Sequence, residues 1–452
     1  MSVPSPLPPL TPPTALRPVR QAATLIVLRD GALGLEALLL RRADKANDQN
    51  SGASVFPGGL LDAHDRHLHG CCAGLDDAAA SARLSVPAGG LDYYAAAVRE
   101  CFEEAGILFA QDAQHRLVDL DQLAPGQLAA MRSAAAAGTD ALLAMCSTKG
   151  WQLAMDRLAY FAHWLTPPGM PRRFDTRFFI AAVPPNQRVE VDRTEIAEHT
   201  WLRPADAIDP SRGLKLMNVT RRILQQLAQF ESVDECMTHS RALRDIGLTM
   251  PRLANGPGGP RPVNMEEPAY AEVGFVDPDG RGHARHTLEG GLVLQLCATV
   301  LRVTSNAGGE PGAHSYFVGA GAEGPWALID AHIGDLAHAQ ALRAAAPGPV
   351  RWILSTREHV VAKSVASTWR DAWPDAEFGA FEPGTELRLG EAMLRVLAAG
   401  RDASARSFLL LHEGSEGSEG MLFAGDAVLS PADLPPQANW LAPMHGFLRP
   451  TK

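Results

Sequence analysis

The chain has 452 residues, of which 46% are apolar and 20% are charged. This composition excludes a disordered or fibrous protein, and the length makes two domains the natural expectation. The formal net charge of -10 argues against a nucleic-acid-binding protein, because phosphate contacts need clustered Lys and Arg. Six cysteines in a chain of this length indicate reduced thiols, as in a cytoplasmic protein, rather than a disulfide framework.

The first half of the chain reads as one α/β domain over residues 21–250. Residues 1–20 are proline-rich and predict a disordered leader, with no apolar run suited to a signal peptide or a membrane span. Two β-type runs, 22–30 and 34–42, meet at Gly31 and predict a hairpin. Further elements follow in order: a tight loop at 57–59, a helix at 97–110, helices within 120–157, a strand at 172–184, a strand entering a helix at 199–208, and helices within 216–244.

The composition changes in the middle of the chain. Residues 251–281 are rich in Pro and Gly without periodicity, which predicts a linker. Short strand-like runs then alternate with helical stretches, which predicts a second α/β domain over residues 282–452.

One stretch of the first domain, AVRECFEEAGILFA at 97–110, gathers carboxylates on one side of a predicted helix. Val98, Cys101, Phe102 and Ala105 recur at helical spacing and predict a buried face. Glu100, Glu103 and Glu104 share the other side, where like charges repel one another. A bound divalent cation would offset that repulsion. The alternative is an ordinary solvated acidic face.

The pattern Arg99-Glu100-x-x-Glu103-Glu104-x-Gly106, preceded by FPGG at 56–59, resembles the Nudix box. The resemblance implies an α/β/α sandwich with a mixed sheet that hydrolyses nucleoside diphosphate derivatives with Mg²⁺ or Mn²⁺. It also implies that Glu103 and Glu104 are the main metal ligands and that Glu100 is a third ligand or the base. Arg99 would hold a helix glutamate in place. A further ligand would come from Glu198 or Glu195, and substrate contacts would come from Arg42, Phe56, Gly58 and Gly59.

The match departs from the family pattern in one region. Asp65 stands where the family has a glutamate, and 33 residues (66–98) separate it from Arg99, many more than usual. This long insertion, together with HWLTPPGMPRRFDTRFF at 163–179, resembles one branch of the family, that of the coenzyme A diphosphatase called nucleoside diphosphate-linked moiety X motif 19. The insertion contains HDRHLHGCC at 64–72, whose side chains could bind zinc. The spacing fits no closed zinc motif, so an ordinary surface loop is expected.

The substrate is less sharply indicated. Leu38, Leu39, Arg42, Ala43 and Gly52 match a signature of enzymes that cleave coenzyme A, but Leu40 stands in place of a threonine and a second arginine is missing. Coenzyme A or acyl-coenzyme A is therefore the favoured small-molecule substrate. A nucleotide-sugar or ADP-ribose-type pyrophosphatase remains an alternative, as does a nucleotide-sensing protein without catalysis. No nucleic-acid or membrane partner is expected, and a homodimer is left open.

The second domain resembles the metallo-β-lactamase fold, an αββα sandwich. The resemblance rests on HSYFVG at 314–319, ALIDAH at 327–332, ILSTREHVVAKSVA at 353–366 and LFAGDAVL at 422–429. Arg357, Val361, Ala362 and Arg401 occupy positions where the family has metal ligands, and guanidinium groups do not ligate cations. His359, Asp426 and His445 are what remains. We expect a non-catalytic domain that lacks most metal ligands.

Overall fold

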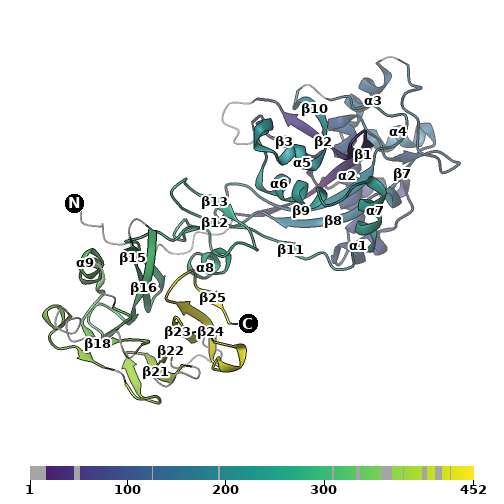
Figure 1. The fold of residues 1–452 in the computed structure, drawn as a ribbon. Helices are drawn as coiled ribbons and strands as arrows, with labels where there is room; N and C mark the ends of the chain where they lie inside the picture. Colours follow the sequence, from purple (N-terminus) through teal and green to yellow (C-terminus); the bar gives the residue numbers. More distant parts are fainter. Residues whose placement is uncertain are drawn as a thin grey trace. The chain divides into compact units, whose positions relative to one another are not determined.

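The computed structural model describes residues 17–44, 51–124, 126–191, 194–307, 310–331, 336–357, 369–379, 381–399, 405–412, 420–427 and 429–451. The described residues form two compact units (Figure 1). The N-terminal unit holds 17–166 and 170–250, and the C-terminal unit holds 251–451 with 167–169. The expected leader lies outside the described residues except for 17–20, and the first strand already begins at Val19. In the part of the chain that the structure describes, no helix has the length and apolar character of a membrane span.

The N-terminal unit is built on a mixed eight-stranded sheet with the order β10-β2-β1-β9-β8-β11, to which β3 and β4 are added. The predicted hairpin is confirmed, since β1 (Val19–Gly31) and β2 (Gly34–Arg42) pair antiparallel. β9 (Arg173–Ala182) runs parallel to β1. The remaining strands of this sheet are β3 (Ser54–Val55), β4 (Gly58–Leu60), β8 (Ala159–Leu165), β10 (Ile196–Leu202) and β11 (Leu248–Thr249).

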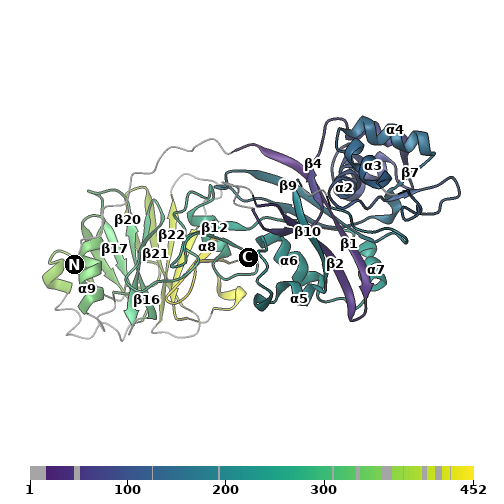
Figure 2. The same ribbon diagram turned by 90° about the horizontal axis from the view of Figure 1, so that it is seen from above.

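Alternate residues of β1 enter two different apolar cores, one on each face of the sheet. Leu25 and Val27 pack with α2 (Gly90–Ala105), whereas Ile26 and Leu28 pack with α6 (Asn218–Leu227) and α7 (Val233–Ala242). A strand buried on both faces reads as a continuous apolar run, as β1 does. The predicted α/β/α sandwich with a mixed sheet is therefore confirmed (Figure 2).

The other elements of the N-terminal unit lie mainly in the segments between these strands. Its helices are α1 (Asp77–Leu84), α3 (Gln127–Ala135), α4 (Thr139–Lys149) and α5 (Pro204–Ile208), with short 3-10 turns η1 (Asp65–Cys71), η2 (Met155–Arg157) and η3 (Pro210–Arg212). A second, small sheet joins β5 (Cys72–Ala73), β7 (Gln152–Ala154) and β6 (Ala110–Gln111). The region 120–157, predicted as helices, thus also contributes the strand β7.

The C-terminal unit packs two six-stranded sheets face to face. The first has the order β14-β15-β16-β17-β18-β19 and the second β20-β21-β22-β23-β24-β25. The strands are β14 (Val293–Cys297), β15 (Val300–Ala307), β16 (Glu310–Gly319), β17 (Trp326–Ile329), β18 (Val350–Leu354), β19 (Glu377–Phe378), β20 (Glu386–Leu389), β21 (Ala392–Ala398), β22 (Arg406–His412), β23 (Gly420–Gly425), β24 (Ala438–Pro443) and β25 (Arg449–Pro450). A short turn, η5 (Pro431–Asp433), precedes β24.

Alternation along β16 assigns its two faces. Tyr316 and Val318 join a core shared with Phe408 and Phe423 of the second sheet, whereas Phe317 packs on the side of α9 (Leu336–Ala345). Figure 2 shows α9 on the outside of the first sheet. The structure therefore establishes a two-sheet α/β sandwich with a helix on one outer face. The finer likeness to a lactamase fold stays a prediction.

Residues 251–281, expected to form a linker, instead contain regular structure that belongs to the C-terminal unit. β12 (Arg252–Ala254) and β13 (Arg261–Val263) form a hairpin, and α8 (Tyr270–Val276) follows. On α8, the carboxylate of Glu272 accepts two hydrogen bonds from Arg302 of β15, at 2.6 and 2.8 Å, with both side chains buried. The expectation of a linker was wrong for this segment, because the buried ion pair and a small apolar core hold it in the C-terminal unit.

Candidate active site

Helix α2 carries the acidic motif, and its burial pattern explains why the segment is helical. Val98, Cys101 and Phe102 are fully buried against the sheet, as their spacing predicts. The helix ends at Gly106, whose φ of +71° is the left-handed conformation that glycine tolerates best. The Gly106 N–H closes the last turn on the carbonyl of Phe102. The glutamates are thereby held on the opposite side of a firmly anchored helix.

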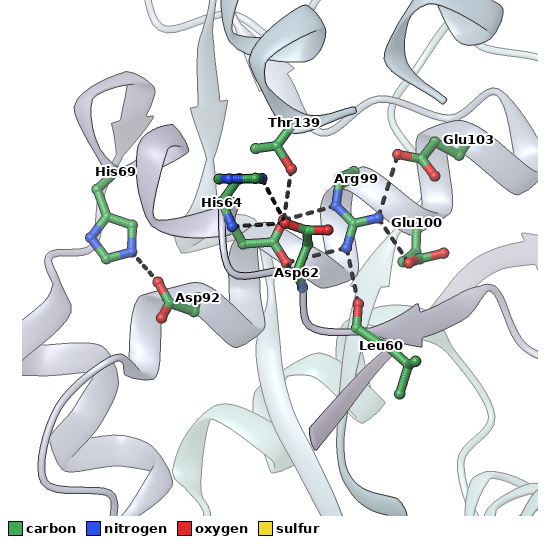
Figure 3. Close-up of polar contacts among 10 residues, drawn as sticks. Leu60, Asp62, His64, His69, Asp92, Arg99, Glu100, Glu103 and Thr139 are labelled. Atoms are coloured by element: carbon green, nitrogen blue, oxygen red, sulfur yellow. Dashed lines mark hydrogen bonds and ion pairs between the residues drawn. The ribbon is translucent and has the colours of Figure 1, made fainter. Parts of the chain in front are cut away.

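Arg99 lies at the centre of a network of carboxylates (Figure 3). Its Nη1 donates to Glu100 Oε1 at 2.8 Å and to Glu103 Oε1 at 3.4 Å, and its Nη2 donates to the carbonyl of Leu60 at 3.0 Å. The guanidinium is almost fully buried. Burial alone would lower its pKa, but the pairs with Asp65, Glu100 and Glu103 outweigh that effect and the pKa of Arg99 is raised. Arg99 therefore stays charged and positions two of the glutamates.

Asp65 is the most buried of the three carboxylates that pair with Arg99. Its oxygens accept from Arg99 Nε at 2.8 Å and from Nη2 at 3.2 Å, and its side chain has no exposed surface. The same carboxylate accepts from the backbone N–H of Asp62 at 2.8 Å and from the hydroxyl of Thr139 at 3.4 Å. Segment 64–72, expected as an ordinary surface loop, is mostly the turn η1, which buries Asp65, Leu68 and Cys71. That expectation was wrong because the turn provides the buried partner of Arg99.

The glycines of the preceding loop leave room for the helix carboxylates. Gly58 donates its N–H to Glu104 Oε2 at 2.9 Å. A Cβ on Gly59 would lie 2.4 Å from the carboxyl carbon of Glu100, and one on Gly58 would lie 2.6 Å from the carbonyl oxygen of Ala23. Any side chain here would displace Glu100 or separate β4 from β1. The loop is glycine-rich because the backbone itself contacts the acidic helix.

The carboxylates of α2 are partly desolvated, and this sets their protonation. Burial raises the pKa of Glu103 to about 7, against the opposing charge of Arg99. Burial raises the pKa of Glu104 to about 8, with the Gly58 hydrogen bond opposing and the charges of Glu100 and Glu195 adding to the rise. The pKa of Glu100 is raised by burial too, again opposed by Arg99. If Asp65, Glu100, Glu103 and Glu104 were all ionised, their four negative charges would face the single positive charge of Arg99.

This donor set fits a hard divalent cation, which prefers carboxylate oxygens and would supply the missing positive charge. Among the described residues, no group of three or more His, Cys, Asp or Glu side chains is gathered as a metal-binding cluster. The carboxylates instead face protein donors, because Arg99 holds Glu100 and Glu103 while Gly58 holds Glu104. The chemistry of the carboxylates therefore fits the metal, although one oxygen of each carboxylate accepts a hydrogen bond from a protein donor.

The predicted site residues outside the helix and the glycine loop differ in how close they lie to the carboxylates of α2. Glu198 is 60% exposed and its Oε1 accepts from Arg41 Nε at 2.6 Å. Glu195, the alternative, is close enough for its charge to act on Glu100 and Glu104, and Arg42 acts on Glu104. Phe56 is buried in the apolar core with Ile26 on the α6 side of the sheet. The roles of Glu198, Arg42 and Phe56 in binding stay predictions.

In the C-terminal unit, Arg357 pairs with Asp426, one of the remaining candidate metal ligands. Arg357 Nη2 lies 3.1 Å from Asp426 Oδ2, and His445 Nε2 lies 3.8 Å from Asp426 Oδ1. Nearby, buried Asp330 accepts hydrogen bonds from the N–H and the hydroxyl of Thr356. Burial raises the pKa of Asp330 to about 6, opposed by those bonds. His359, Val361, Ala362 and Arg401 lie outside the described residues.

Comparison with known proteins finds Nudix domains similar to the N-terminal unit. The model of the NUDT19 Nudix domain matches residues 76–216. A nudix hydrolase of Caenorhabditis elegans is 23% identical over 211 residues, which are 46% of this chain and 61% of the worm protein, less than two thirds of its length. The acyl-coenzyme A diphosphatase NUDT19 of Xenopus laevis is 27% identical over 284 residues, or 55% of this chain and 73% of the frog protein. A crystal structure of a Nudix hydrolase from Alicyclobacillus acidocaldarius aligns with 28% identity and a TM-score of 0.43, covering 52% of this chain and 100% of that one.

The acidic helix and its supporting arginine lie within the residues that match the NUDT19 Nudix domain, so the N-terminal unit carries a Nudix domain. Within that family it is NUDT19-like, as the long segment between Asp65 and Arg99 predicts. The matched residues contain the whole of α2, so the family assignment rests on the unit that carries the candidate site.

Proposed function

We propose that the N-terminal unit hydrolyses the diphosphate bond of coenzyme A or acyl-coenzyme A in a reaction that needs Mg²⁺ or Mn²⁺. The observation that carries the proposal is the set of partly desolvated carboxylates on α2 around Arg99, which is suited to a divalent cation and a diphosphate. The name of the frog relative, acyl-coenzyme A diphosphatase, supports the substrate class.

The residues would divide the work as follows. Glu103 and Glu104 would hold the cation, with a further carboxylate from Glu195 or Glu198. A bound cation neutralises the diphosphate and lowers the pKa of a coordinated water. Glu100 would be a third ligand or the general base. Because Arg99 occupies its Oε1, Oε2 is the atom we assign to accept the proton of the attacking water.

Arg99 and Gly58 act as positioning groups in this scheme. Arg99 fixes Glu100 and Glu103 relative to each other, and the N–H of Gly58 orients Glu104. Gly59 keeps the loop backbone close to Glu100. Such preorganisation matters because a misplacement of about 1 Å at a reacting group can lower the rate roughly 100-fold.

The test is product release from a panel of diphosphates by the wild-type chain and Glu103→Gln, with Mg²⁺, Mn²⁺ or EDTA. The panel contains coenzyme A, an acyl-coenzyme A, NADH, ADP-ribose and a nucleotide sugar. Glu36→Gln is a matched control, since Glu36 has the same 19% side-chain exposure as Glu103 and also pairs with one arginine. We expect cleavage of the coenzyme A compounds that is lost in Glu103→Gln and in EDTA but kept in Glu36→Gln. Cleavage of another class of diphosphate alone would show that coenzyme A compounds are not the substrate. Normal turnover by Glu103→Gln would refute the assignment of the active site to α2.

For the C-terminal unit we infer a lactamase-like sandwich without a catalytic metal centre. The pairing of Arg357 with Asp426 supports this, because a guanidinium beside a carboxylate repels a cation. Metal analysis of the purified full chain after dialysis should find less than one tightly bound zinc per chain. A stoichiometric zinc that is lost on Asp426→Asn would contradict the inference.

A further inference from the structure

The last turn of α2 carries two glutamates at the end of a helix where negative charge is unfavourable. The helix dipole places partial negative charge at the C-terminal end, and Glu103 and Glu104 add to it. The last turn of α2, all of it within the described chain, contains no basic residue. The final carbonyls of a helix also lack partners within the helix. This turn therefore depends on positive charge and hydrogen-bond donors from elsewhere in the chain.

Arg132 of α3 supplies both the charge and the donors. Its Nε donates to the carbonyl of Glu103 at 3.4 Å, and its Nη1 donates to the carbonyl of Glu190. Arg132 is only 7% exposed, so its positive charge lies next to the end of α2 with little screening by water. A cation at the C-terminal end of a helix interacts favourably with the helix dipole. The end of the acidic helix is thus completed by a different helix.

Three segments converge at this point with little spare room. The N–H of Glu190 donates to the carbonyl of Ala105 at 2.9 Å, so the carbonyls of Glu103 and Ala105 are bound by α3 and by residue 190. A Cβ on Gly106 would lie 3.2 Å from Cδ of Arg132, 3.2 Å from the carbonyl oxygen of Glu190 and 3.3 Å from its Cβ. Because these groups are in close contact, a shift of Arg132 would be transmitted to the last turn of α2.

We propose that Arg132 is a positioning residue of the Nudix site, which holds the last turn of α2 where Glu103 and Glu104 can bind a cation together. Arg99 acts on the side chain of Glu103, whereas Arg132 acts on its backbone carbonyl. The two arginines therefore fix different parts of the same residue. This role rests on the proposed function, because it concerns the metal that the carboxylates of α2 would hold. It does not depend on which diphosphate is cleaved.

The experiment titrates the full chain with Mn²⁺, followed by electron paramagnetic resonance, in the wild type, Arg132→Met and Arg132→Lys. Methionine keeps an unbranched apolar side chain but has neither the charge nor the donors, whereas lysine keeps the charge as a single ammonium. Residues that orient metal ligands typically contribute 10- to 100-fold to metal affinity or activity, so we expect the Kd for Mn²⁺ to rise about 10-fold in Arg132→Met and less in Arg132→Lys. At saturating Mn²⁺, kcat should fall by a similar factor and KM should stay near the wild-type value.

Arg173→Met is the matched control. Arg173 is also 7% exposed and its Nε donates to a backbone carbonyl, that of Thr166, at 3.1 Å, but it lies in β9. Both methionine variants should melt at a lower temperature than the wild type, and only Arg132→Met should bind Mn²⁺ more weakly. Hydrogen exchange in EDTA gives a readout without metal. The amides of Gly106 and Glu190, which bond to the last turn of α2, should exchange faster in Arg132→Met and at the wild-type rate in Arg173→Met.

Each outcome separates the role of Arg132 from the proposed function. Wild-type Mn²⁺ affinity in Arg132→Met, or an equal loss of affinity in Arg173→Met, would overturn the role of Arg132 and leave the metal site standing. A wild-type chain that binds no Mn²⁺ would overturn the proposed function and this role with it. Mn²⁺ binding that is weakened in Arg132→Met, in a chain that cleaves no coenzyme A compound, would support the role and refute only the substrate. If Arg132→Met does not fold, Arg132→Lys against Arg173→Lys decides by the same criteria.

Discussion

Replacing Asp65 by asparagine is the sharpest test of how the active-site helix is held. The substitution keeps the shape of the side chain but removes its charge and turns one acceptor oxygen into a donor. Asp65 accepts four hydrogen bonds, two of them from Arg99, and has no exposed side-chain surface. Its new amide would face donors that already point at it, and Arg99 would lose its most buried partner.

The cost follows from burial. Removing one partner of a buried ion pair costs about 3–5 kcal/mol, because the other charge is left uncompensated. Arg99 retains Glu100, Glu103 and the carbonyl of Leu60, so we expect the lower end, about 3 kcal/mol. For a unit of this size that corresponds to a fall in melting temperature of roughly 6–12 °C. Arg99 would also position Glu100 and Glu103 less well, so kcat/KM should fall about 10- to 100-fold.

The assay combines thermal and urea denaturation with diphosphate hydrolysis. Asp140→Asn is the matched control: Asp140 also pairs with a residue of η1, His67, but its side chain is 75% exposed. An exposed pair contributes about 1 kcal/mol or less, so this control should stay close to wild type. If Asp65→Asn were as stable and as active as Asp140→Asn, the reasoning that Asp65 anchors Arg99 would be refuted.

The remaining predictions concern the loop, the metal and the additional carboxylate. Gly59→Ala should lower kcat/KM at least 10-fold while the chain still folds, because its Cβ would fall 2.4 Å from the Glu100 carboxyl carbon; unchanged kinetics would contradict the close approach. Without metal, the pKa of Glu103 is raised to about 7 and that of Glu104 to about 8, so their contribution to stability is greatest below about pH 4.5 and is lost as pH rises through 7 and 8. The melting temperature in EDTA should therefore fall between pH 5 and pH 8, and added Mg²⁺ should raise it more at pH 8 than at pH 5. An equal rise at both pH values would refute the link between metal binding and deprotonation of these carboxylates. Glu195→Gln should weaken Mg²⁺ stabilisation more than Glu198→Gln, because Glu195 acts on Glu100 and Glu104 whereas Glu198 is bound to Arg41; the reverse order in a titration would favour Glu198.

Local patterns in the sequence were sufficient for much of the N-terminal unit. The β1–β2 hairpin follows from two apolar runs around a turn, and α2 with its glycine cap follows from the spacing of Val98, Cys101 and Phe102. These features depend on neighbours within a few residues, so periodicity and turn residues encode them. The Nudix box itself is local for the same reason.

Contacts between distant segments could not be read from the pattern. The sequence did not suggest the hydrogen bond from Thr139 to Asp65, which joins residues 74 positions apart. The prediction of a linker at 251–281 was wrong for a different reason. Pro and Gly are common in hairpin turns as well as in linkers, and this segment contains the β12–β13 hairpin. What makes that segment part of a unit is the buried pair of Glu272 with Arg302, and nothing in either residue alone announces its partner.

The long insertion between Asp65 and Arg99 shows why spacing in a motif can vary while its geometry stays. Helix α1 folds back against the start of α2 so closely that a Cβ on Gly90 would lie 2.3 Å from the backbone nitrogen of Ser81. The Gly90 N–H donates to the Ser81 hydroxyl at 2.9 Å, and Asp77 accepts from the N–H groups of Gly89 and Leu91. These contacts fix residues 77–91, the middle of the inserted segment, against one another. Because the entropy of closing a loop grows only with the logarithm of its length, 33 residues can be accommodated once such contacts form, and Asp65 still reaches Arg99 at 2.8 Å.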